Sequence, residues 1–207
     1  MELTELQRDA LTELINIGFG RAAASLSRIT GHRVLLEVPH VDIHPITGLN
    51  AALGGVLMGE IATVHQVFSG PVAGDALLVL DAAGAGMIKR LLTDEAPLPL
   101  ALDASGQEVV TEVGNILLNA CLGMFGNLLK VQVSFSVPRL TLETLGMVLE
   151  SLTIGRQELR YALVVHAAFR LRDNSLRGYL VIVLSVDSLD RLIHAVEAWQ
   201  HRQELPS

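Results

Sequence analysis

Apolar and polar positions along the chain follow helical and strand periodicities, and the two kinds of pattern occur in the same order twice. Each half shows a helical pattern, an alternating run, two short apolar runs typical of a β-hairpin, and a second helical pattern. The alternating runs are 34–38 and 131–137, the paired runs are 63–68 with 75–80 and 164–169 with 178–184, and the closing helical stretches are 83–92 and 188–200. Turn residues at 69–71 and 172–175 separate the paired runs. The predicted order in each half is helix, strand, hairpin, helix.

The first helical pattern of each half carries the same set of polar residues. One set is Asp9, Glu13 and Asn16, and the other, at a constant offset of 99 residues, is Glu108, Glu112 and Asn115. Each asparagine is followed 23 positions later by a proline, Pro39 or Pro138, at the end of the alternating run. The recurrence of both spacings indicates an internal duplication.

Each polar set lies on one side of its helix. A helix turns by roughly 100° per residue, so each set spans roughly 60° of arc and forms a polar ridge. We call residues 9, 13 and 16 the first ridge and residues 108, 112 and 115 the second ridge. The apolar residues beside the first ridge, which we expect on the buried side, are Ala10, Leu11, Leu14 and Ile17. A ridge of this kind is usually the solvent-exposed face of an amphipathic helix. The repeated asparagine argues for a function, because asparagine is a poor helix former.

The pattern favours an α+β fold with long helices packed on a shared, largely antiparallel sheet, because neighbouring strands outnumber βαβ units. We expect a single domain over 1–207, made of two pseudo-two-fold related repeats at about 1–99 and 100–207. The segment 93–99, with two prolines and two acids, suits the link between them. Two independent small domains are the alternative, although each would be marginal at that length.

Composition excludes several classes of protein. Half of the residues are apolar and only 4% are aromatic, which predicts an aliphatic core and rules out disorder. The net charge of −7 and the absence of a basic run argue against nucleic-acid binding. The uncharged stretch 113–129 is too short and too rich in asparagine and glycine for a membrane span, and the first residues lack a signal-peptide layout. We therefore expect a soluble cytoplasmic protein without membrane insertion, with Cys121 buried and inert.

Some other candidate sites carry less weight. His40, Asp42 and His44 alternate along one face of a predicted strand and could ligate a metal, but no further ligand is identifiable, so we interpret them as a solvent-facing strand ending at Pro45. His65 and His166 occupy matching hairpin positions, which duplication explains. The glycine-rich stretch 82–86 lacks the lysine of a phosphate-binding loop and is typical of a turn before a helix.

The repeated spacing resembles the signature of the CheC, CheX and FliY phosphatases of chemotaxis. That signature begins with Asp or Ser. A Glu follows four positions later, an Asn three positions after the Glu, and a Pro 23 positions after the Asn. The chain carries it in full at Asp9, Glu13, Asn16 and Pro39, and again at Glu112, Asn115 and Pro138. The duplicated pattern and the length are most similar to CheC. Glu108 departs from the signature, because the family has Asp or Ser there.

The resemblance implies hydrolysis of the aspartyl phosphate on a CheY-like receiver protein. It implies that Glu13, Asn16, Glu112 and Asn115 are catalytic, that Asp9 and Glu108 help to bind the substrate, and that Pro39 and Pro138 are structural. No cofactor of the chain's own is expected, because the required Mg²⁺ would sit on the receiver. The alternative is a non-catalytic adaptor of the chemotaxis or flagellar switch system that binds a receiver or CheD. Since Glu108 is longer than the family's residue, we expect the first site to be the stronger.

Overall fold

The computed structural model describes residues 3–31, 33–93, 102–153, 160–171 and 174–204. Six α-helices and a short 3₁₀ helix occur in these ranges: α1 (Glu5–Thr30), η1 (Ile46–Gly48), α2 (Leu49–Leu53), α3 (Ala82–Thr93), α4 (Ala104–Leu129), α5 (Leu145–Thr153) and α6 (Val186–Glu204). The strands are β1 (Val34–Pro45), β2 (Glu60–Ser69), β3 (Gly74–Asp81), β4 (Ser134–Phe135), β5 (Arg139–Thr144), β6 (Arg160–Leu171) and β7 (Asn174–Ser185).

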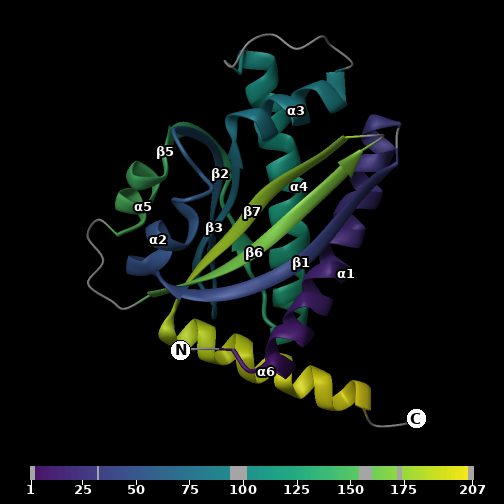
Figure 1. The fold of residues 1–207 in the computed structure, drawn as a ribbon. Helices are drawn as coiled ribbons and strands as arrows, with labels where there is room; N and C mark the ends of the chain where they lie inside the picture. The colour runs from purple at the N-terminus through teal and green to yellow at the C-terminus, as the bar shows by residue number, and fades with distance from the viewer. Residues whose placement is uncertain (1–2, 32, 94–101, 154–159, 172–173, 205–207) are drawn as a thin grey trace.

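The strands form one curved sheet in which strands from the two halves are interleaved (Figure 1). Their order is β1-β6-β7-β3-β2-β4, and β5 also pairs with β2. Every strand pair that the structure describes is antiparallel. The first strand of each half therefore pairs with the hairpin of the other half, and the α+β fold with a shared antiparallel sheet is confirmed. The element order is the same in both halves, although an origin by duplication stays a prediction.

Local sequence signals set the ends of the two long helices. Thr4 caps α1, because its hydroxyl accepts from the backbone N–H of Gln7 while the Gln7 side chain accepts from the backbone N–H of Thr4. Gly31 ends α1 in a left-handed conformation that glycine adopts at no steric cost. Asp103 caps α4 by accepting from Gly106 N–H. The helices that carry the two ridges are thus defined at their starts by side-chain caps.

Helices cover the two faces of the sheet unequally (Figure 1). The long helices α1 and α4 lie side by side on one face, where they share a core with α3 and α6. The short helices α2 and α5 cover part of the opposite face, which we call the outer face, over a smaller apolar cluster. Helix α4 is long and apolar enough to cross a membrane, but 56% of its most apolar window is buried inside the fold, as in the core helix of a soluble protein.

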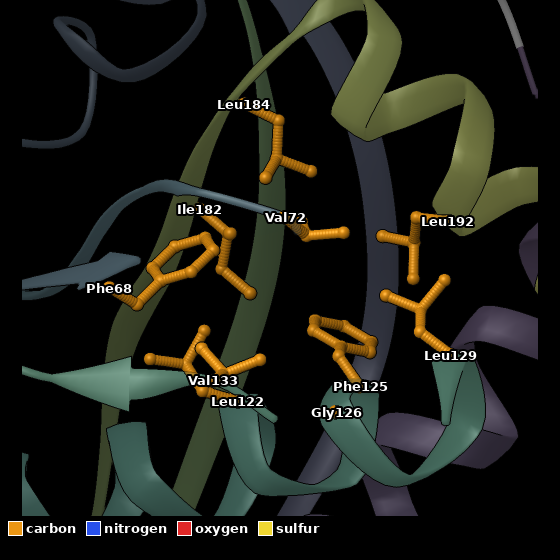
Figure 2. A pocket seen from close by; sticks show the side chains of 10 residues that line it. All are labelled: Phe68, Val72, Leu122, Phe125, Gly126, Leu129, Val133, Ile182, Leu184 and Leu192. Carbon is orange, nitrogen blue, oxygen red and sulfur yellow. The ribbon is translucent and has the colours of Figure 1, made fainter. Parts of the chain in front are cut away.

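The main core contains one small apolar cavity of about 20 Å³, between α4, α6 and strands β2 and β7 (Figure 2). The side chains that line it are all hydrocarbon, among them Phe68, Phe125 and Leu192. That volume is close to the minimum for one water molecule, and the lining offers no polar partner to hold one. The cavity is therefore a packing defect and not a ligand site.

Both edges of the sheet are irregular at the signature prolines. Between Glu37 and His40 strand β1 advances one residue more than β6, so Pro39 lies in a β-bulge. The predicted strand 131–137 is wrong for most of its length, since only β4 is extended there and a second strand, β5, resumes after Pro138. Proline has no N–H to donate to a strand ladder and is confined to edges and bulges. Pro138 therefore interrupts the edge that pairs with β2.

The predicted hairpins and closing helices are confirmed as β2 with β3, β6 with β7, and α3 and α6. The interpretation of residues 82–86 as a turn is wrong, because α3 already begins at Ala82. Strand β1 runs to Pro45, as the interpretation of residues 40–44 requires. The second predicted hairpin turn falls partly on residues 172–173, which lie outside the described residues, and β7 already begins at Asn174. Most of the predicted link 93–99 also lies outside them.

Candidate functional site

The first ridge lies on the exposed side of α1, with Asp9, Glu13 and Asn16 all exposed to solvent. Within the described residues neither carboxylate forms an ion pair. Arg8, the nearest basic residue in the sequence, points elsewhere, because its Nη1 lies 3.0 Å from Oδ1 of Asp42 on β1. The two carboxylates are therefore available to a basic group on a partner.

The side chain of Asn16 is held by the backbone of β1. Its Oδ1 accepts a hydrogen bond from the N–H of Val38 at 3.0 Å. Val38 lies in the bulge beside Pro39, where the ladder to β6 shifts register. Since Val38 N–H can only donate, the bonded atom of Asn16 must be the carbonyl oxygen. The amide is thereby fixed, and within the described part of the chain its two N–H groups and its second oxygen lone pair have no partner.

This contact gives the spacing between Asn16 and Pro39 a physical reason. The proline marks the bulge, and the residue before it supplies the N–H that holds the asparagine. Sequence reasoning found the proline and missed Val38, because a backbone donor leaves no trace in residue type. The only signal was the fixed distance to Pro39.

The second ridge on α4 is built differently. Glu108 and Glu112 are exposed, but Asn115 is only partly exposed. Its Oδ1 accepts from Nδ2 of Asn119 at 2.7 Å, one turn further along the same helix. Val137, which precedes Pro138 as Val38 precedes Pro39, makes no hydrogen bond to Asn115 among the described residues. Glu112 and Asn115 thus lie three residues apart on α4, and the donor behind the asparagine is a side chain instead of a backbone N–H.

A buried glutamine lies behind Asn119. Gln66 on β2 is 2% exposed, and its Nε2 donates to Oδ1 of Asn119 at 3.3 Å and to the backbone oxygen of Ser136 at 2.9 Å. Asn119 itself is partly buried, and its side chain donates to Asn115. The sequence did carry a sign of Gln66's role, because a polar residue there interrupts the apolar positions of the strand that face the core.

Two apolar side chains are exposed in the segments that carry the signature residues. Ile17, expected on the buried side of α1, is 42% exposed, so that prediction is wrong. Ile17 sits about 100° from Asn16 around the helix, outside the stripe that packs on the sheet. Near the second site, Val137 is 82% exposed. Single exposed apolar residues of this kind are normal on a protein surface and do not by themselves mark a binding site.

The histidine and aspartate residues of β1 form a network on the outer face. His40 Nε2 lies 2.8 Å from Asp42 Oδ2, and the His40 ring meets the His166 ring edge-on at 5.4 Å. Burial, and then the proximity of His40, lower the pKa of His166, against the opposing effect of Asp42. Among the residues that the structure describes, no three His, Cys, Asp or Glu side chains are arranged to hold a metal ion.

Other candidate residues have structural partners. His65 contacts Asp75, whose other oxygen pairs with buried Arg160 at 2.6 Å. Cys121 is fully buried, as expected, and burial raises the pKa of its thiol. A cysteine of that kind is a poor nucleophile, because the thiolate is the reactive form.

The two ridges share a chemical arrangement. Each presents a carboxylate and, three residues later, a carboxamide anchored through its oxygen. A carboxylate can pair with a lysine, and a fixed neutral amide can orient a water molecule without adding charge beside an anion. Orientation and charge pairing are what such a surface can supply to a reaction that takes place on a bound partner.

Comparison with known proteins finds relatives in chemotaxis. A model of the CheC-like family matches residues 6–43, which span the first ridge and Pro39. The chain is 25% identical over 202 residues to the CheY-P phosphatase CheC of Bacillus subtilis, covering 95% of this chain and 96% of that protein. It is also 25% identical over 143 residues to the flagellar motor switch phosphatase FliY of the same organism, covering 68% of this chain and 37% of FliY.

Solved structures show the same fold. The crystal structure of Thermotoga maritima FliY has a TM-score of 0.75 at 20% identity, with 96% of this chain and 99% of that chain covered. The FliM middle domain from H. pylori has a TM-score of 0.66 at 13% identity, with 93% and 99% covered. The sequence matches and the shared fold confirm the resemblance indicated by the repeated ridges: the chain fits the CheC, CheX and FliY family.

Proposed function

We propose that the chain is a cytoplasmic phosphatase that hydrolyses the aspartyl phosphate of a CheY-like receiver in chemotaxis signalling. The anchored amide of Asn16 carries this proposal, because it stands between the free carboxylate of Glu13 and the bulge at Val38. Relatives named CheY-P phosphatase and flagellar motor switch phosphatase support the same reaction class. Aspartyl phosphate on a receiver would be the substrate, and the chain itself would form no covalent intermediate.

In the proposed reaction Asn16, or Asn115 at the second site, orients a water molecule in line with the phosphorus atom. The water oxygen forms a bond to phosphorus as the bond from phosphorus to the receiver's aspartate oxygen breaks. The products are inorganic phosphate, which takes the oxygen and both protons of the water as H₂PO₄⁻, and the free aspartate carboxylate. A rigid amide contributes by holding the water in an attacking position, which removes an entropic part of the barrier.

Glu13 and Glu112 have a separate role in this proposal. Each would form a charge-assisted pair with a lysine of the receiver, which positions the phosphorylated aspartate against the asparagine. Asp9 and Glu108 extend the same acidic surface and would help to bind the receiver. The Mg²⁺ that neutralises phosphoryl charge is assigned to the receiver, and the residues described here offer no comparable set of ligands.

The alternative is a non-catalytic adaptor that binds a receiver, CheD or the flagellar switch. The likeness to the FliM middle domain fits this alternative only weakly, because at 13% identity it shows the fold alone. Nothing in the described surface distinguishes a CheD contact, which stays a prediction.

The decisive experiment follows the decay of a phosphorylated CheY-like receiver at substoichiometric amounts of this chain. A phosphatase releases many equivalents of phosphate per molecule, whereas an adaptor changes decay only in proportion to the complex formed. The variant Asn16→Ala/Asn115→Ala is the control and should return the decay to its spontaneous rate. Full activity in that folded variant would refute the proposed mechanism.

A further inference from the structure

Three carboxamide side chains form a connected series behind the second site. Gln66 donates to Asn119 at 3.3 Å, and Asn119 donates to Asn115 at 2.7 Å. The series joins strand β2 to two positions on α4 that are one helical turn apart. The first site is built without such a series. Gly20 occupies the position that corresponds to Asn119 in the repeat, and the backbone N–H of Val38 anchors Asn16 directly.

The direction of the hydrogen bonds in the series is fixed at its buried end. The Nε2 group of Gln66 also donates to the backbone oxygen of Ser136 at 2.9 Å, and a carbonyl oxygen can only accept. The amino group of Gln66 therefore faces Asn119, which must offer its own oxygen there and its amino group to Asn115. Asn115 in turn accepts through its oxygen, and neither of its N–H groups has a partner among the residues that the structure describes, as for Asn16.

A second observation concerns the cost of placing Gln66 in the core. Its side chain is 2% exposed, and its Oε1 has no hydrogen-bond partner among the described residues. A buried acceptor without a partner is unfavourable, and a leucine of similar size would avoid that penalty. The neighbouring inward positions of β2, Val64 and Phe68, are apolar and belong to the main core. Gln66 is thus an exception to the apolar pattern, at the point where its side chain bonds to Asn119.

We infer that Gln66 and Asn119 are positioning residues of the second site, which hold the amide of Asn115 in the orientation that Val38 gives to Asn16. This inference rests on the proposed phosphatase function. Neither residue touches the substrate. Gln66 acts through Asn119, and Asn119 acts through Asn115, so their removal lowers the turnover of the second site without weakening receiver binding.

The test uses the full chain with one site silenced at a time. In the Asn16→Ala background only the second site works, and the further change Asn119→Asp sets a carboxylate oxygen against the oxygen of Asn115. Asn115 then turns its amino group inward, and we expect kcat to fall about tenfold with KM changed by less than about twofold. In the Asn115→Ala background, where only the first site works, Asn119→Asp should leave kcat unchanged.

Gln66→Leu provides a second variant that keeps the side-chain volume and removes both the donor and the unpaired acceptor. It should fold as the parent does and lower kcat of the second site by roughly threefold, because Asn119 keeps its bond to Asn115 but loses its own restraint. In NMR spectra of the unmodified chain, the side-chain amide protons of Asn119 should exchange more slowly than those of Asn127, an exposed residue on the same helix.

Each result supports or overturns the inference. Equal losses from Asn119→Asp in both backgrounds would indicate general damage to the fold and overturn it. Unchanged second-site turnover, or no turnover at all in the Asn16→Ala background, would also overturn it, as would fast exchange at Asn119. The proposed function fails on a different result, namely the absence of catalytic turnover in the unmodified chain.

Discussion

The carbonyl oxygen of Asn16 accepts a hydrogen bond from the backbone N–H of Val38 at 3.0 Å, so the first ridge is tied to the bulge at the edge of the sheet. The bond joins two segments that are far apart in the sequence and fixes a side chain that would otherwise rotate in solvent. An exposed asparagine usually gains little from its surroundings, but this one has its plane set by the backbone. The orientation of the amide is therefore a property of the sheet as much as of α1.

Two substitutions at Asn16 separate anchoring from catalysis. Asn16→Asp keeps an oxygen to accept from Val38 and replaces the amino group, so the free energy of unfolding should stay within about 0.5 kcal/mol of the parent. Asn16→Ala leaves Val38 N–H unpaired and should cost about 1 kcal/mol, partly offset by the better helix propensity of alanine. In an Asn115→Ala background both should lower kcat about 100-fold. Urea unfolding and phosphate release measure the two effects, and an active Asn16→Asp would contradict the role of the amide.

The two sites should differ in strength. Asn16 is exposed, whereas Asn115 is partly buried against Asn119, and Glu108 reaches further than the residue that the family has at that position. We expect Asn16→Ala to lose more activity than Asn115→Ala in otherwise unmodified chains. Steady-state phosphate release from a phosphorylated receiver compares the two variants, and the reverse order would refute the ranking.

Glu13 should contribute to receiver binding as well as to turnover. Glu13→Gln keeps the size and the helix propensity of the side chain but removes the charge that would pair with a lysine. In the Asn115→Ala background we expect KM for the phosphorylated receiver to rise roughly fivefold, with a stronger effect at low salt. Glu5→Gln, at the start of the same helix, is the matched control for net charge. A rise in KM that is equal for both variants would show long-range attraction only.

Replacing helical glycines by alanine should stabilise the protein at some positions and destabilise it at another. A Cβ added at Gly123 in α4 or at Gly86 in α3 would meet nothing within 4 Å, whereas one added at Gly114 would lie 2.6 Å from Cγ1 of Val64. Gly123→Ala and Gly86→Ala should each raise the free energy of unfolding by about 0.5–1 kcal/mol. Gly114→Ala should lower it by about 1–3 kcal/mol, because α4 must move away from β2. Chemical denaturation distinguishes the signs, and a stabilising Gly114→Ala would contradict the close packing.

Acidification should destabilise the outer face through His166. Its pKa is held below the ordinary value of 6.5 by burial and by His40, with Asp42 opposing and Tyr179 packed against the ring. The unfolded chain therefore binds a proton at a higher pH than the folded chain, and the free energy of unfolding falls as the pH drops below 6.5. His166→Gln removes that part of the loss. Between about pH 7.5 and about pH 5.5, the free energy of unfolding should fall more in the parent than in His166→Gln. Equal losses in the two proteins would refute the assignment.

Much of the fold follows from periodicity in the sequence. The hairpins, the closing helices and the shared antiparallel sheet could be predicted because strand alternation and helical spacing are local properties of the chain. The broken strand around Pro138 could not, because whether an alternating run pairs along its length depends on its partner, β2. Strand β5 did carry a signal, with Leu140 and Leu142 alternating with polar residues.

The site was predictable to a different extent. The ridges were visible because side chains of one kind recur at helical spacing. The supports of the asparagines were less visible, since Val38 acts through its backbone and Gln66 acts across the sheet-helix interface. Contacts between distant segments depend on how α4 packs on β2, which no local pattern specifies. The sequence therefore indicated the candidate site residues but not the groups that orient the two asparagines.

During synthesis, strand β1 leaves the ribosome well before β6, its neighbour in the sheet. The register shift around Val38 exists only relative to β6, so the nascent N-terminal half has no template for the bulge that holds Asn16. Pairing between strands so distant in sequence forms late in folding. A chain that stopped after α3 would carry every residue of the first signature and still lack an oriented amide. The activity proposed for the first site would thus require translation to reach the second half of the protein.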